Sequence, residues 1–274
     1  MKNIFKKEFN SKGIVKINNI INSRILEKLN KKINLIFNNI MIEKKIITNP
    51  INIFQYPNIL RKFKNNFPDL FLNIKHKAIQ KLPEVYEIGN SKKIKKYLKS
   101  LGLKSPVYST DPLIMMHHNS TNISAKGDYA PLHQDWRSIQ GSLNCIVIWI
   151  PIAELNDKMG NIEYYPSSHL QGLLPTLKHS WYRKVDFSLS KKIKIKKDRI
   201  KKGDAFFFSS FLIHKSAINK DNKIRVSLQF RYNDIEDKDY IRRGYPCNYI
   251  HSVPKKKLLK KDIPELEKIK RLYK

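Results

Sequence analysis

The chain has 274 residues, 2 cysteines and a formal net charge of +31, with 54 Lys and Arg against 23 Asp and Glu. This length can bury a full hydrophobic core, and two isolated cysteines, Cys145 and Cys247, make neither a disulfide framework nor a zinc motif. The longest apolar run, 145–153, is too short for a membrane span of ~20 residues, and charge interrupts the N-terminus too early for a signal peptide. A cytoplasmic protein is therefore expected.

The first 110 residues are predicted to be mostly helical. Residues 13–17 form a short predicted strand. Ser23 is the predicted N-cap of an amphipathic helix that runs to about residue 42, because isoleucine and leucine recur there at helical spacing. A second helix is predicted over 69–82, and a third is bracketed by Ser91 and Gly102.

From residue 112 the hydrophobic period changes to two, which is typical of strands. The predicted strands are 113–117, 130–136, 144–150, 161–165, 204–208, 212–216 and 224–232. Several short strands with turn signals between them indicate a sandwich or barrel. The tail from Lys255 is predicted to be a short basic helix.

Two histidines and one aspartate form a candidate metal site. His133 and Asp135 lie two residues apart in the predicted strand 130–136, so strand alternation would point both side chains to one face. His214 follows far downstream, and Arg225 comes 11 residues after it. Two imidazoles and one carboxylate, with coordination positions left open, are the ligand set of non-heme Fe(II) oxygenases. A remote arginine suits the far carboxylate of a 2-oxoacid cosubstrate, because its planar fork binds a carboxylate bidentately.

The chain resembles the phytanoyl-CoA dioxygenase-like family of Fe(II)/2-oxoglutarate oxygenases from about Phe9 to Tyr245. The matching segments are Phe9-Asn-Ser-Lys-Gly-Ile-Val-Lys-Ile, His133-Gln-Asp-Trp, Val147-Ile-Trp-Ile-Pro, Gly160-Asn-Ile-Glu-Tyr-Tyr-Pro-Ser-Ser-His, Gly203-Asp-Ala-Phe-Phe-Phe and His214-Lys-Ser through Arg225. One departure is Ser167, which stands where the family usually has a glycine, and this puts the local loop shape in doubt.

The resemblance implies that His133, Asp135 and His214 bind Fe(II), and that Arg225 and Ser216 bind the tail of 2-oxoglutarate. It also implies a mainly β fold with α, a double-stranded β-helix of jelly-roll (cupin-like) type with an N-terminal helical buttress. The expected reaction uses O₂, decarboxylates 2-oxoglutarate to succinate and CO₂, and hydroxylates a C–H bond of a small molecule. Halogenation is not expected, because Asp135 occupies the position that chloride would need.

The candidate substrate contacts are less specific. Trp136, Arg137 and Gln140 follow the ligand pair in a predicted loop, and such loops often carry substrate contacts. Arg231 shares a face of its strand with Arg225, so it either reaches the pocket mouth or pairs with an acidic neighbour at the rim. His117 ends a strand and either lines the pocket or lies at the surface.

His169 is the alternative third ligand, since it follows Asp135 by 34 residues. It stands in a predicted turn, and the arginine 11 residues downstream belongs to His214. A histidine that orders the loop is the other interpretation.

The positive charge raises the question of nucleic acid or a membrane surface. Residues 128–183, which carry the first two ligands, hold 4 basic and 5 acidic side chains, whereas 191–202 hold 8 basic and 1 acidic. A demethylase acting on nucleic acid should concentrate the charge around the site. A general bias of the composition toward lysine, asparagine and isoleucine produces the same surplus without any partner and is the favoured interpretation; non-specific binding to an acidic partner or a membrane surface is the alternative.

A single oxygenase domain over 1–274 is therefore expected, with a helical part (1–110), a jelly-roll core that contains the iron site (111–250) and a basic tail (251–274). The expected partner is a polar or anionic small molecule, with no nucleic acid and no membrane span. The alternatives are a nucleic-acid demethylase on the same scaffold, a non-catalytic cupin-like binding protein, and a purely structural protein.

Overall fold

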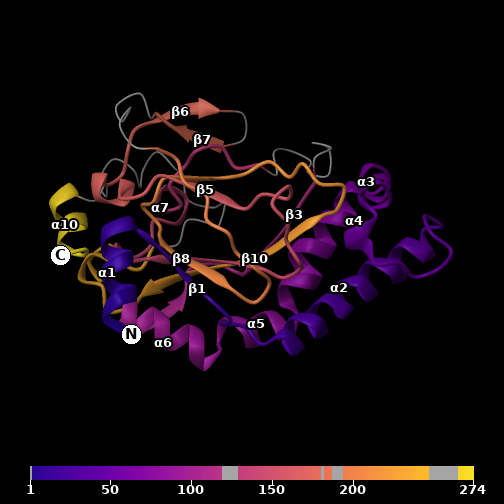
Figure 1. Cartoon of the computed structure of the whole chain (residues 1–274), viewed down its shortest axis with the longest axis horizontal. Coiled ribbons are helices and arrows are strands. Elements are labelled where there is room, and N and C mark those ends of the chain that lie inside the picture. Colours follow the sequence, from indigo (N-terminus) through magenta and orange to yellow (C-terminus); the bar gives the residue numbers. More distant parts are fainter. Residues whose placement is uncertain (1, 119–128, 180–181, 187–193, 247–264) are drawn as a thin grey trace.

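A six-stranded antiparallel sheet forms the centre of the fold (Figure 1). The computed structural model describes residues 2–118, 129–179, 182–186, 194–246 and 265–274. The strand order is β1-β8-β4-β10-β2, and β3 pairs with β10 off this path. The strands are β1 (Ile14–Ile17), β2 (Pro106–Tyr108), β3 (Leu113–His117), β4 (Ile146–Pro151), β8 (Ala205–Ser209) and β10 (Arg225–Asp234). The long strand β10 pairs with β4 along one edge and with β3 and then β2 along the other.

A second layer of short strands lies above this sheet in Figure 1. Strand β5 (Ile162–Tyr164) pairs with β9 (His214–Ser216), and β6 (Thr176–His179) forms a hairpin with β7 (Tyr182–Val185). An isolated antiparallel bridge between His133 and His214 continues the pairing of β9. This bridge brings two distant chain segments together between the two layers.

Helices cover the outer face of the main sheet, and α2, α5 and α6 run beneath it in Figure 1. The helices are α1 (Lys2–Lys12), α2 (Ser23–Glu43), α3 (Pro57–Asn66), α4 (Pro68–Asn73), α5 (Pro83–Gly89), α6 (Lys92–Leu101), α7 (Trp136–Ile139), α8 (Lys238–Arg242) and α10 (Leu266–Arg271). Shorter helical turns lie at Ile53–Gln55, Ile74–Ala78, Ile79–Lys81 and Ser168–Gln171. No described helix is both long and apolar enough to cross a membrane.

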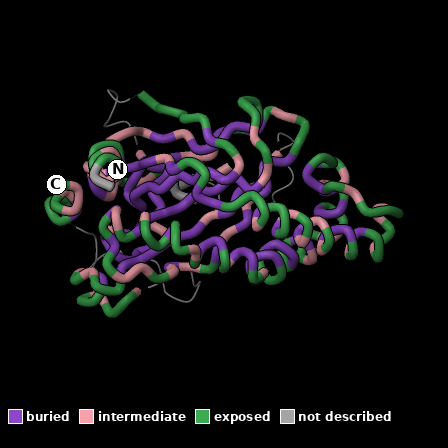
Figure 2. Tube along the Cα trace, turned by 60° about the horizontal axis from the view of Figure 1, so that its bottom comes forward, coloured by how far each residue is buried: buried purple, intermediate pink, exposed green. Residues whose placement is uncertain are grey.

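The alternation of β10 divides the core from the site. Val226, Leu228 and Phe230 are buried in the cluster that the main sheet forms with the N-terminal helices. Arg225 and Arg231 lie on the opposite face, toward the small strands. Figure 2 shows that buried residues concentrate along the strands and on the inward sides of the helices. The main sheet therefore has one apolar face, which packs against the helices and stabilises the fold, and one face that carries polar side chains.

Several sequence predictions are confirmed. Strand β3 has the predicted bounds, and β1, β4, β5, β8 and β10 lie within a residue or two of theirs. Helix α6 is capped as expected: the Ser91 hydroxyl accepts from the Ile94 N–H, and Gly102 has φ 120°. Cys145, whose place in the apolar run 145–153 predicts a small buried side chain, is fully buried, and burial raises the pKa of its thiol to about 12. Cys247 and the tail segment 255–264 lie outside the described residues.

Other predictions are wrong. Residues 130–136 form no strand, and Asn22 rather than Ser23 caps α2, because the Asn22 side chain accepts from the Arg24 N–H. The helix predicted over 69–82 is broken into α4, a π turn and a 3-10 turn, and β9 begins two residues later than predicted. The elements α1, α3, α5, β2, β6, β7 and α8 were not predicted.

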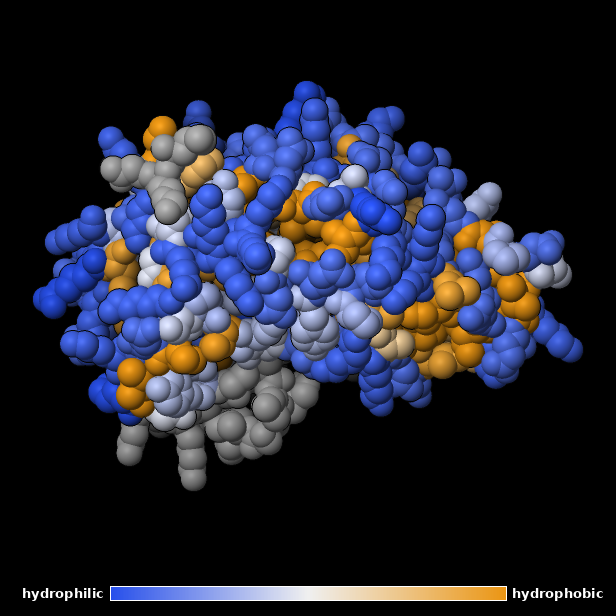
Figure 3. All heavy atoms as spheres, turned by 90° about the horizontal axis from the view of Figure 1, so that it is seen from below, coloured by the Kyte–Doolittle hydropathy of each residue, from blue (hydrophilic) through white to orange (hydrophobic). Residues whose placement is uncertain are grey.

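Figure 3 shows a mostly hydrophilic surface on the side seen from below, with apolar side chains gathered in a central hollow and toward one end. Hydrophilic side chains cover most of the rest of this face.

Candidate active site

The structure brings His133, Asp135 and His214 together in one buried cluster. Their ligand atoms all lie within 4.8 Å of one another, and no other such cluster is found among the described residues. His214 Nε2 is 3.5 Å from Asp135 Oδ2, and His133 Nε2 is 3.9 Å from Asp135 Oδ1. The three residues are only 6%, 2% and 6% exposed in the order His133, Asp135 and His214. Two imidazoles and one carboxylate in this arrangement suit non-heme Fe(II) with open coordination positions.

The backbone reaches this arrangement differently from the predicted strand. His133 and His214 exchange both backbone hydrogen bonds, at 2.9 and 3.0 Å. Asp135, however, has helical torsions, φ −62° and ψ −34°, and stands at the N-cap of α7. The Trp136 N–H donates to the Ser210 carbonyl at 2.9 Å, which anchors this turn beside the end of β8. The aspartate therefore faces the histidines because of a helical turn, and not because of strand alternation.

Backbone carbonyls orient both histidine rings. His133 Nδ1 lies 2.7 Å from the Pro131 carbonyl, and His214 Nδ1 lies 3.0 Å from the Leu212 carbonyl. A carbonyl can only accept, so Nδ1 of each ring carries the proton and Nε2 presents its lone pair to the cluster. The edge of Phe208 packs against His214, with ring centroids 4.7 Å apart. Sequence reasoning missed Phe208, although the alternation of β8 could have placed it on this face.

The protonation states also match those that a metal requires. Burial, with the neighbouring His214 in support, lowers the pKa of His133 to about 3. Burial also lowers the pKa of His214. Burial would raise the pKa of Asp135, but Arg231 and the two histidines outweigh it and bring the value to about 2. Neutral imidazoles and an ionised carboxylate are thus present at neutral pH.

Arg225 and Ser216 lie near each other at the start of β10 and the end of β9. Arg225 is 1% exposed, and its Nη1 donates to the carbonyls of Met159 (3.0 Å) and Ala217 (2.9 Å). Ala217 directly follows Ser216 in the chain. His117 is the cross-strand partner of Arg225, and its ring lies 5.2 Å from that of Tyr129. The predicted cosubstrate residues and His117 therefore lie around one end of β10.

The residues after Asp135 form a short helix and not the predicted loop. Trp136 is 1% exposed and stacks on Phe211 at 5.3 Å, so its ring belongs to a packing cluster. Arg137 donates through Nη2 to the Leu174 carbonyl at 2.5 Å. Gln140 ends α7 with left-handed torsions, and Arg243 Nη1 donates to its carbonyl at 2.7 Å. These contacts fix α7, and α7 in turn positions Asp135 at its N-terminus. A contact of Trp136, Arg137 or Gln140 with substrate stays a prediction.

Arg231 pairs with an acidic neighbour, and this neighbour is the metal-binding carboxylate itself. Its Nη2 lies 3.0 Å and its Nε 3.4 Å from Asp135 Oδ1. Both side chains are buried, so this ion pair belongs to the interior of the site.

His169 lies outside the metal cluster. It is fully buried, its Nε2 lies 3.0 Å from the Asn10 carbonyl, and its ring meets Tyr273 edge-on at 4.3 Å. The interpretation of His169 as a third ligand is therefore wrong, and the loop-ordering alternative describes its contacts. The preceding Ser167 keeps the left-handed backbone expected of a glycine, with φ 62°, and its N–H and hydroxyl donate to the Lys12 and Ser11 carbonyls.

His169 should make folding stability depend on pH. Burial lowers its pKa from 6.5 to about 4. The unfolded chain therefore takes up this proton first, so the contribution is complete above about pH 6.5 and is lost as the pH falls toward 4. At pH 5 the loss should be ~2 kcal/mol. Denaturant unfolding of the wild type and of His169→Gln at both ends of this range tests it. Equal pH slopes in the two proteins would contradict the assignment.

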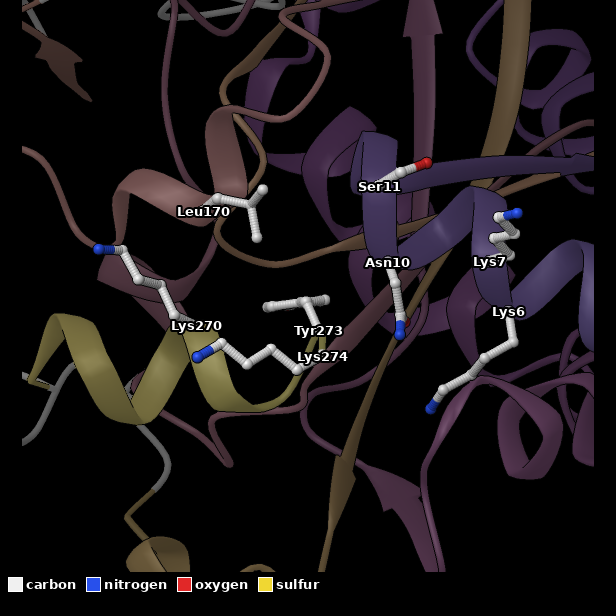
Figure 4. Close-up of a pocket in the computed structure, with 8 residues that line it drawn as sticks. All are labelled: Lys6, Lys7, Asn10, Ser11, Leu170, Lys270, Tyr273 and Lys274. Carbon is white, nitrogen blue, oxygen red and sulfur yellow. The ribbon is translucent and has the colours of Figure 1, made fainter.

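A separate surface pocket of about 680 Å³ lies between α1, the turn at Ser168–Gln171 and α10 (Figure 4). Its lining residues are Lys6, Lys7, Asn10, Ser11, Leu170, Lys270, Tyr273 and Lys274. None of them belongs to the metal cluster or to the polar face of β10, so this pocket is not the candidate active site.

Two antiparallel sheet layers around a buried His-Asp-His set are what a non-heme iron oxygenase of the 2-oxoglutarate-dependent class needs. The family model of phytanoyl-CoA dioxygenase (PhyH) matches residues 9–227, and the chain belongs to this family. Iron and 2-oxoglutarate are accordingly its cofactors. A search of curated proteins finds no match.

Solved structures share the fold at low sequence identity. The epimerase SnoN, in complex with Fe3+, alpha ketoglutarate and nogalamycin RO, is 12% identical with TM-score 0.56, over 85% of this chain and 83% of its own. The alpha ketoglutarate dependent carbocyclase SnoK from nogalamycin biosynthesis is 12% identical with TM-score 0.55, over 91% and 93%. EvdO2 from Micromonospora carbonacea var. aurantiaca, complexed with 2-oxoglutarate, is 12% identical with TM-score 0.53, over 84% and 89%.

Proposed function

We propose that the protein is a dioxygenase that hydroxylates a C–H bond of a small molecule while 2-oxoglutarate is converted to succinate and CO₂. The observation that carries this proposal is the buried cluster of His133, Asp135 and His214, with Nε2 of both rings turned inward. Bound Fe(II) would supply O₂ activation and the oxidative decarboxylation of the cosubstrate. The three side chains would leave the remaining coordination positions open for these reactants.

Arg225 and Ser216 are proposed to bind the distal carboxylate of 2-oxoglutarate. Arg225 is buried and already orients its Nη1 with two carbonyls, which fixes the guanidinium before the cosubstrate arrives. A fixed planar fork can form charge-assisted bonds with a carboxylate, and a serine hydroxyl can add one neutral hydrogen bond. The burial of Arg225 would keep water from competing for its contact, whereas Ser216 is half-buried.

We infer that the two sheet layers are the halves of a double-stranded β-helix and that the chain is one domain. Supporting this, β10 belongs to the large layer and β9 to the small one, and both reach Asp135, through Arg231 of β10 and His214 of β9. The likeness to 2-oxoglutarate enzymes of known structure spans most of the chain.

The proposed substrate is a polar or anionic small molecule. His117, Arg137 and Gln140 remain candidate contacts: His117 pairs with Arg225 across the sheet, and Arg137 and Gln140 follow Asp135 closely in the chain. The near-neutral charge of 128–183 favours a small molecule over nucleic acid. Among the similar structures, SnoN is an epimerase and SnoK a carbocyclase. Ring closure and hydroxylation can both follow removal of a hydrogen atom from carbon, so either outcome fits the same site.

A screen for stimulated succinate release tests this function. Anaerobically reconstituted protein is given O₂ and pools of polar metabolites, and products are identified by mass spectrometry. We expect a product gain of one oxygen, or a loss of two hydrogens, and no chlorinated product in chloride buffer, because Asp135 would occupy the chloride position. Stimulation by nucleic acid alone would contradict the substrate class, and a chlorinated product would contradict the reaction.

A further inference from the structure

Arg231 contacts one oxygen of the iron-ligand carboxylate and not the other. Its Nη2 and Nε lie 3.0 and 3.4 Å from Asp135 Oδ1, and the Arg231 side chain is only 6% exposed. The other oxygen, Oδ2, lies 3.5 Å from His214 Nε2, and Oδ1 lies farther, 3.9 Å, from His133 Nε2. The two carboxylate oxygens therefore have different surroundings before any metal binds.

The backbone holds this guanidinium in place. Arg231 pairs with Val147 at the centre of the main sheet, on a strand with paired neighbours on both sides. Its Nη2 also donates to Gln229 Oε1 at 3.3 Å, from the same face of β10. A buried side chain on a central strand has little freedom to follow the carboxylate if Asp135 turns.

The number of coordination positions that Asp135 uses depends on whether one or both of its oxygens bind the metal. A carboxylate that binds through both oxygens uses one more coordination position than a carboxylate that binds through one. If the two histidines, the aspartate and a chelating 2-oxoacid held a six-coordinate iron, a position would remain for O₂ only if the aspartate used one oxygen. We propose that Arg231 is a positioning residue that retains Oδ1, so that Asp135 binds iron through Oδ2 alone. This inference rests on the proposed function.

The contact also acts on the iron through charge. A guanidinium bonded to Oδ1 withdraws electron density from the carboxylate and places a positive charge near the metal. Its removal should make Asp135 a stronger donor and should not weaken metal binding. An arginine that served only to stabilise the fold would have the opposite effect, because its loss would loosen Asp135 and weaken metal binding.

The test compares Arg231→Met, which keeps the length of the side chain, with Arg231→Lys, which keeps the charge. Two anaerobic measurements are made: Co(II) binding without cosubstrate, and the visible absorption band of protein with Fe(II) and saturating 2-oxoglutarate. For Arg231→Met we expect Co(II) binding about tenfold tighter than in the wild type, which corresponds to ~1.4 kcal/mol. We also expect a band at longer wavelength, and succinate yield lower by about 10- to 100-fold. The band of Arg231→Lys should lie between the other two.

A wild-type band position in Arg231→Met, or weaker Co(II) binding in both variants, would overturn the proposal. Should Arg231→Met not fold, Arg231→Lys decides alone: a shifted band supports the proposal, and a wild-type band with wild-type succinate yield overturns it. His169→Gln is the matched control, because it changes a buried histidine outside the cluster and should move neither Co(II) binding nor the band. Absence of any band in the wild type would instead contradict the proposed function.

Discussion

Replacing any one of His133, Asp135 and His214 with alanine should abolish the absorption band that Fe(II) and 2-oxoglutarate form together under anaerobic conditions. Each substitution removes one of three ligand atoms from a cluster that spans 4.8 Å. Metal affinity should fall by at least ~100-fold, the upper end of what loss of a mere supporting contact costs. Anaerobic titration with Fe(II), followed by visible absorption and metal analysis, measures both effects.

The matched control is His169→Gln, which changes a buried histidine that has no part in the cluster. It should retain both the band and the metal. If the three ligand variants keep the band while His169→Gln loses it, the ligand assignment is wrong. Circular dichroism of the four variants would separate loss of metal from loss of fold.

Replacing Arg225 with methionine should weaken 2-oxoglutarate binding by far more than it weakens metal binding. The substitution removes a buried charge-assisted contact, which costs roughly 2–5 kcal/mol, or about 30- to 5,000-fold in affinity. Ser216→Ala removes one neutral hydroxyl and should cost about 1 kcal/mol. The measurement is titration of the metal-loaded protein with 2-oxoglutarate, with Co(II) affinity of the same variants determined separately.

The prediction depends on Arg225→Met losing more 2-oxoglutarate affinity than Ser216→Ala. Arg225 also donates to the carbonyls of Met159 and Ala217, so Arg225→Met could disturb the loop that follows β9. If Arg225 acted only by holding this loop, its removal would act mainly by displacing Ser216, and the two variants would lose similar affinity for 2-oxoglutarate. Unchanged 2-oxoglutarate affinity in Arg225→Met, or equal losses in the two variants, would refute the assigned role.

The chemistry of the site could be predicted from residue types and their order. A His-x-Asp pair, a distant histidine and a following arginine indicate an iron site and a 2-oxoacid cosubstrate even when no distances are known. The strands around them were predictable where alternation is regular, as in β3 and β10, because one face of each packs against the N-terminal helices.

The failures fall where contacts between distant segments decide the backbone. Residues 130–136 alternate like a strand, yet His133 alone among them forms a β-bridge. From Asp135 the backbone is helical, and the Trp136 N–H donates to the Ser210 carbonyl. The hairpin of β6 and β7 lacks a regular apolar pattern, so periodicity could not reveal it.

The sequence by itself determined the ligand types and the polar face of β10, because these depend on residue types and on local periodicity, and its motifs carried the resemblance to the family. Only the tertiary structure decided which histidine completes the cluster: His214 pairs with His133, whereas His169 packs between α1 and α10. It also decided that Arg231 meets Asp135, which is 96 residues away in the chain. These contacts depend on how the two sheet layers pack against each other, and a local pattern in the sequence does not show which distant residues will meet.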